Sequence, residues 1–314
     1  MIEDEVEPVV PWLSAVVDDH LRERGAVYAL IDRYVALPAP VGDSVNRCLQ
    51  GQRQTAQVLR HALFGQATHR APVLLSFQEE DRELMEQLIT LTGRPRQADP
   101  PHWPGHWLLA SPHVSMVQLR AHLQTLLDVR LHGYPRAAFL RYYDPWVLDV
   151  LWHWLNESQR ARWMGPIEHW HFVRRDGSLH KLSAPQELQE PRSQDSMLVL
   201  DDRASAALLR AEVVNAAYQV LYAWQKPAAA FGYPAVDAAV VAVQQLGLRD
   251  TANLAAGAAA MLSWPQVGHG AFWDHPQVLR AIQASREGVP LRDYIEEHLA
   301  HVLLAPVHDT ADLT

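Results

Sequence analysis

The clearest structural signal in the sequence is Arg136–Leu155, which reads RAAFLRYYDPWVLDVLWHWL. Its first part is largely apolar and predicts a strand over 136–143. Asp144 and Pro145 then predict the start of a helix that continues to Leu155. Aspartate caps helix N-termini, and proline suits the first helical position because its missing N–H would have no partner there. A strand that leads directly into a helix is typical of an α/β domain.

Helix and strand patterns alternate on both sides of this stretch. Short apolar runs predict buried strands, and Asp176-Gly177 predicts a hairpin turn after the last of them. We therefore expect an α/β domain over residues 1–182, with a mixed sheet and flanking helices. Residues 32–42 and 100–106 are rich in proline and are predicted to be loops. The expected strands are 26–31, 73–77, 107–110, 129–131, 136–143 and 167–174, and the expected helices are 12–21, 43–64, 79–91, 115–127, 144–155 and 158–164.

The sequence changes character after this domain. Residues 183–200 are polar, contain Pro185 and Pro191, and are predicted to form a linker. Only helix patterns follow, so residues 201–314 are expected to form an all-α, alanine-rich helical bundle. Its small side chains would let a partner helix approach closely. The expected helices are 202–225, 235–246, 251–263, 276–285 and 291–304.

Composition narrows the class of protein. The 314 residues include 27 basic and 36 acidic side chains, and a net charge of −9 disfavours general binding to nucleic acid. Cys48 is the single cysteine, so no internal disulfide can form. The acidic N-terminus does not resemble a signal peptide, and polar residues interrupt the longest uncharged run. These features predict a soluble cytoplasmic protein that does not bind membranes.

Motifs for catalysis and for cofactors are absent. The sequence contains no Walker loop, no G-x-G-x-x-G after a strand and no G-x-S-x-G. Two groups of histidines are candidates for a metal site, but neither supplies an obvious third and fourth ligand. We expect no metal and no cofactor, and we expect Cys48 to be an inert thiol. The two groups are Glu168 with His169 and His171, and Glu297 with His298 and His301.

Arg141 and Asp144 allow two interpretations. They could form a catalytic pair, which with His169 would make the chain a small α/β hydrolase or transferase. That enzyme would need a deep pocket in which the three side chains converge with perturbed ionisation. The favoured interpretation is structural: Asp144 caps the following helix and Arg141 pairs with it or with a nearby carbonyl.

Tryptophan is unusually concentrated in one part of the chain. Because it buries a large area at low entropic cost, it is over-represented among interface hot spots. Most of these residues are expected in the core, and the remainder would form a protein-binding surface. Seven of the eleven tryptophans lie between residues 103 and 170: Trp103, Trp107, Trp146, Trp152, Trp154, Trp163 and Trp170.

The stretch from Phe139 to Pro145, followed by Gly165-Pro166-Ile167 and a Trp-bearing strand, resembles the adaptor-chaperones of bacterial type VI secretion. Three upstream stretches are also similar to that family, and the resemblance covers roughly residues 26–175. The Arg-Tyr-Tyr-Asp-Pro core is the most specific part. The upstream stretches are Val27–Asp32, Ala71–Leu75 and Leu119–Leu123.

The resemblance implies a non-catalytic protein that binds a toxic effector in the producing cell, keeps it soluble and helps to load it onto the VgrG spike. An enzyme, and a stand-alone effector or immunity protein, remain the alternatives. For the adaptor, we expect partner contacts from aromatic and charged residues near the motif and in the helical domain. These residues are Arg141, Tyr142, Asp144, Trp146, Trp163, Trp264, Phe272 and Trp273.

Overall fold

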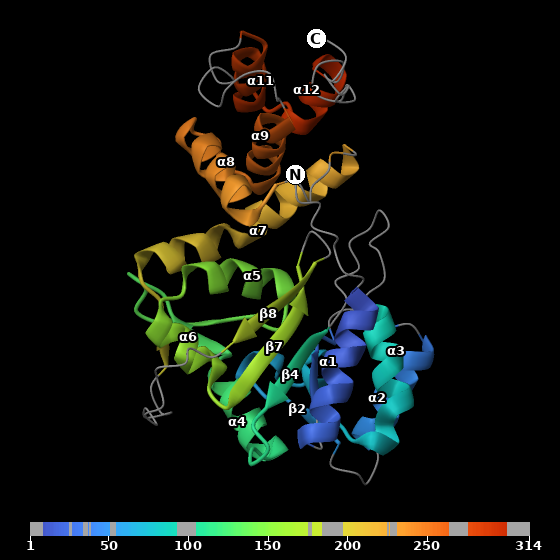
Figure 1. The fold of residues 1–314 in the computed structure, drawn as a ribbon. Helices are drawn as coiled ribbons and strands as arrows, with labels where there is room; N and C mark the ends of the chain where they lie inside the picture. Colours follow the sequence, from blue (N-terminus) through green and yellow to red (C-terminus); the bar gives the residue numbers. More distant parts are fainter. Residues whose placement is uncertain are drawn as a thin grey trace, which may run out of the picture. The chain divides into compact units, whose positions relative to one another are not determined.

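The computed structural model divides the chain into two compact units, residues 1–208 and residues 209–314 (Figure 1). The first unit contains all the strands described below, and the part of the second unit that is described is helical. This arrangement confirms the expected fold class. The structure describes residues 9–24, 27–33, 37, 39–50, 55–92, 105–174, 178–183, 197–224, 226, 231–263 and 276–299.

A six-stranded sheet forms the centre of the first unit. The strand order is β2-β3-β1-β4-β7-β8, and every neighbouring pair is antiparallel. Continuous apolar runs place β1, β3 and β4 in the middle of this sheet, where both faces are covered. The strands are β1 Val27–Ile31, β2 Ala56–Val58, β3 Val73–Phe77, β4 His106–Ala110, β7 Ile167–Val173 and β8 Leu179–Ser183.

A smaller, three-stranded sheet has the order β6-β5-β9. Strand β5 (Asp128–Arg130) pairs antiparallel with β6 (Ala137–Phe139) and parallel with β9 (Leu198–Val199). Strand β9 comes from a distant part of the sequence, and its pairing with β5 places residues 198–199 in the first unit. Leu198, Leu200 and Ala204 accordingly lie in the core of that unit.

Helices cover both faces of the large sheet. Side chains alternate between the faces along each strand, so apolar side chains on both faces need to be buried. On one face, α1 (Val9–Arg24), α2 (Ala39–Gln50) and α3 (Arg82–Thr92) pack against residues such as Trp107 and Leu109, and these three helices lie together in Figure 1. On the other face, Leu108, Trp170 and Phe172 share a core with three further helices. Those helices are α4 Met116–Thr125, α5 Pro145–Trp154 and α6 Glu157–Met164.

In the second unit, α9 (Thr251–Ser263) is the central helix, because every residue from Leu254 to Ser263 is buried. A side chain at Gly257 would lie 2.8 Å from Val243 of α8, so the small residues of α9 serve close packing inside this unit. Arg210 and Asp237 form a two-pronged ion pair there, with both N–O distances at 2.7 Å. The helices are α7 Asp202–Ala223, which begins in the first unit, α8 Tyr233–Gln245, α9, α11 Pro276–Arg286 and α12 Leu291–His298.

Several local predictions were wrong. The expected helix 43–64 is replaced by α2, which begins inside the expected loop at Ala39, by β2 and by the 3₁₀ turn Ala62–Phe64. Residues 56–58 pair with the edge of β3, and these ladder hydrogen bonds override their helical pattern. The expected strand 136–143 ends at Phe139, since a turn closed by the Asp144 N–H and the Arg141 carbonyl follows.

Other predictions concern the boundaries of the domains and the hairpin. Ser183 ends β8, and residues 198–200 pack in the first unit, while the rest of the predicted linker, 184–196, lies outside the described residues. The predicted turn Asp176-Gly177 also lies outside them, although the strands on either side of it, β7 and β8, pair as expected. Within the described ranges, no helix is both long and apolar enough to cross a membrane.

Candidate functional site

The motif Phe139–Pro145 connects β6 to α5, and local hydrogen bonds explain its shape. The Leu140 N–H donates to the Leu127 carbonyl at 2.8 Å, which extends the contact of β6 with β5 by one residue. The Asp144 carboxylate then accepts a hydrogen bond of 2.9 Å from the Trp146 N–H, and Pro145 occupies the first turn of α5. Asp144 is therefore the helix cap that the sequence predicts.

Arg141 is the most exposed charged group of this motif, and it lies between two buried carboxylates. Its guanidinium donates to Asp32 at 3.3 Å and lies 4.0 Å from Asp144. The Arg141 side chain is 44% exposed, whereas those of Asp32 and Asp144 are 4% and 10% exposed. Burial alone would lower the pKa of Arg141, but the two carboxylates outweigh burial and raise it. The cation is thus held in one place while part of it still faces solvent.

Two further groups interact with this ion network, Tyr143 and His106. The Arg141 guanidinium is 5.9 Å from the centre of the Tyr143 ring, and burial together with the charge of Asp32 raises the pKa of Tyr143. His106 is fully buried and accepts a hydrogen bond of 3.0 Å from the Trp170 indole on Nδ1, so its proton lies on Nε2. Burial lowers the pKa of His106 to about 4, against the opposing effects of the Tyr143 carbonyl and Asp144. The His106 imidazole is therefore neutral at physiological pH.

The aromatic residues predicted for partner contact near the motif belong to the core. Tyr142, Trp146 and Trp163 are at most 1% exposed. The Tyr142 hydroxyl donates to the Leu123 carbonyl at 2.8 Å, and its ring packs edge to face against Trp163 and Trp170. A side chain with no exposed surface cannot touch a partner unless the fold opens, so these residues support Arg141 from within. Trp264, Phe272 and Trp273, predicted for the helical domain, lie outside the described residues.

The separate stretches that carry the sequence resemblance contact one another in the fold. Arg141 reaches Asp32 at the end of β1, Tyr142 reaches Leu123 of α4, and Leu30 of β1 pairs with Leu74 of β3. Gly165 joins the same set. It has a positive φ of 51°, which favours glycine, and a Cβ added there would overlap the His122 ring. That ring is held by a hydrogen bond of 2.9 Å with the Trp163 carbonyl. The stretches are therefore linked by direct contacts, and two of them contact the turn that carries Arg141.

The structure does not bring His169 to Arg141 and Asp144. His169 pairs in register with Leu109 and lies 6.3 Å from His171, which contacts Trp12 of α1. This is the opposite face of the sheet from the motif, which shares its core with Trp170 and Phe172. Asp144, the other residue on which the enzyme alternative depends, caps its own helix.

The structure describes the two histidine groups of the sequence except for His301. The described residues contain no cluster of three or more His, Cys, Asp or Glu side chains arranged to hold a metal ion. His169 instead shares a hydrogen bond of 3.3 Å with Ser183. In the second group, His298 lies 3.7 Å from Glu297 and packs on Tyr294, while His301 lies outside the described residues.

Sequence reasoning missed two members of the site. The sequence places Asp32 at the end of a similar stretch and in the predicted loop 32–42, and it places His106 in the predicted loop 100–106. Asp32 directly follows a fully buried strand, so a charged side chain there needs a partner within the fold. The position of Asp32 after this strand could therefore have identified it as part of a buried ion pair. No comparable sequence signal identifies His106, because its role depends on the pairing of β4 with β1 and β7.

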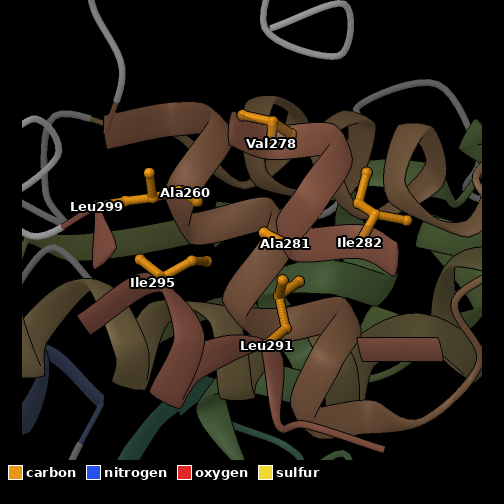
Figure 2. Close-up of a pocket in the computed structure, with 8 residues that line it drawn as sticks. Ala260, Val278, Ala281, Ile282, Leu291, Ile295 and Leu299 are labelled. Atoms are coloured by element: carbon orange, nitrogen blue, oxygen red, sulfur yellow. The ribbon is translucent and has the colours of Figure 1, made fainter. Parts of the chain in front are cut away.

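The second unit contains a small apolar pocket between α9, α11 and α12 (Figure 2). Glycine and alanine of α9 leave room on one side, and aliphatic side chains of the other two helices close it. Each lining side chain is itself buried. The lining residues are Gly257, Ala260, Val278, Ala281, Ile282, Leu291, Ile295 and Leu299.

Comparison with known proteins gives one match. No curated protein and no solved structure matches the chain. Residues 27–162, somewhat less than half of the chain, match the family model described as Domain of unknown function (DUF4123). This range contains Asp32, His106 and the whole Phe139–Pro145 motif, so the residues that build the Arg141 site fall within a recognised protein domain whose function is not established.

Proposed function

We propose that this protein is a cytoplasmic, non-catalytic adaptor-chaperone of type VI secretion. It binds a toxic effector in the producing cell, keeps the effector soluble and helps to load it onto the VgrG spike. The proposal is supported by the sequence resemblance around Phe139–Pro145 and by the match of residues 27–162 to one domain model.

The observation that carries the proposal is the convergence of the similar stretches. Four segments that are far apart in the sequence are linked by direct contacts. Asp32 and Leu123 contact the turn that holds Arg141, Leu74 pairs with Leu30, and Gly165 packs closely on His122. A resemblance that rested on chance matches would leave such segments scattered over the fold. Their convergence supports a shared domain architecture, and with it the function that the resemblance implies.

Arg141 is the residue of this site best suited to meet a partner. Its charge is fixed by Asp32 and Asp144, so little side-chain entropy would be lost when a partner binds. A fixed arginine with exposed donors is also a frequent interface hot spot. A holder must bind the effector before loading and release it when contacts with the spike replace its own.

A pull-down with a matched pair of variants tests the proposal. Arg141→Lys keeps the positive charge but loses the planar donor fork. Arg174→Lys is the control, because Arg174 is 38% exposed and pairs with Asp149 at 3.0 Å, outside the motif. We expect the tagged wild-type chain and the Arg174 variant to retain the effector encoded beside its gene, and the Arg141 variant to retain roughly ten-fold less, as the loss of about 1.4 kcal/mol would give.

Two results would count against this account. Failure of the wild-type chain to retain any segment of the effector would overturn the adaptor function itself. Equal retention by both variants, with thermal unfolding that matches the wild type, would leave an adaptor whose partner surface does not include Arg141.

A further inference from the structure

We draw no further inference here: the strongest candidate, the apolar pocket between α9, α11 and α12 (Figure 2), is lined by buried aliphatic side chains, and nothing in the described residues shows what covers it.

Discussion

The guanidinium of Arg141 donates a 3.3 Å hydrogen bond to the carboxylate of Asp32, although the two residues are 109 positions apart in the sequence. This contact joins the end of β1 to the turn before α5. Both carboxylates near Arg141 are buried, so the network holds the motif to the central sheet as well as presenting a charge at the surface.

Removing the cation from this network should destabilise the first unit. Arg141→Ala leaves Asp32 and Asp144 buried without their shared cation. Because Arg141 is 44% exposed, we reduce the cost of breaking a fully buried pair and expect a loss of about 1–2 kcal/mol in the free energy of unfolding. Urea unfolding of Arg141→Ala, Asp32→Asn and the double variant measures this loss and should give a coupling of at least about 0.5 kcal/mol. Strictly additive effects would show that the contact contributes nothing to stability.

Gly165 offers a test of the packing beneath the motif. An alanine there would adopt an unfavourable positive φ and would also overlap the His122 ring. Gly133 has a positive φ of 76° with nothing within 4 Å of an added Cβ, so Gly133→Ala reports the backbone cost alone. We expect Gly133→Ala to cost about 1 kcal/mol and Gly165→Ala at least about 2 kcal/mol, as measured by urea unfolding. Equal losses for the two variants would contradict the close contact with His122.

Buried histidines make the stability depend on pH. Burial, with Lys181 and neighbouring histidines, lowers the pKa of His171 to about 3, and neither of its ring nitrogens has a hydrogen-bond partner among the described residues. The pKa of His106 is about 4. In the unfolded chain both histidines have a pKa of about 6.5, so the unfolded state gains protons first as the pH falls. Their contribution to stability is complete above that pH and is lost progressively toward pH 4 and then pH 3.

His171→Leu tests this dependence. Each histidine that stays neutral in the fold adds roughly 1.4 kcal/mol per pH unit to the slope of stability between about pH 6 and pH 4.5. Urea unfolding over that range should therefore give a slope that is smaller in the variant by about that amount. An unchanged slope would mean that His171 is protonated in the folded protein over this range.

At Gly257, helix propensity favours a substitution by alanine, whereas close packing opposes it. Alanine is favoured over glycine inside a helix by about 1 kcal/mol, yet an added Cβ at Gly257 would lie 2.8 Å from Val243 and 3.4 Å from Leu291. We expect packing to dominate and Gly257→Ala to lose about 1–3 kcal/mol in thermal or urea unfolding of the full chain. Val243→Ala in the same chain should recover part of the loss. A variant more stable than the wild type would show that α8 and α9 are packed less closely than described.

Some elements of this fold could be predicted from the sequence because the residues of each element are enough to specify it. The apolar runs of β1, β3 and β4 and the Asp144-Pro145 start of α5 need no information from distant residues. Strand β2 was missed because three residues show too little periodicity, and it exists through pairing with β3.

Which residues form the site depends on long-range contacts that the sequence does not reveal. The motif that carries Arg141 could be identified, but the burial of Tyr142 and Trp163 follows from their packing against Trp170 in a strand nearly 30 positions from Tyr142. Likewise, Asp32 and His106 join Arg141 and Asp144 only after β1 and β4 pair in the sheet. Spacing in the sequence predicts neither contact.

The most direct measurement of the central claim is co-expression of the chain with the large protein encoded beside its gene, followed by size-exclusion chromatography with light scattering. The adaptor account predicts a stable complex of defined mass, well above the 35.4 kDa of the chain alone, and a partner that is insoluble when expressed by itself. A 35.4 kDa monomer that elutes apart from a soluble neighbour would contradict it.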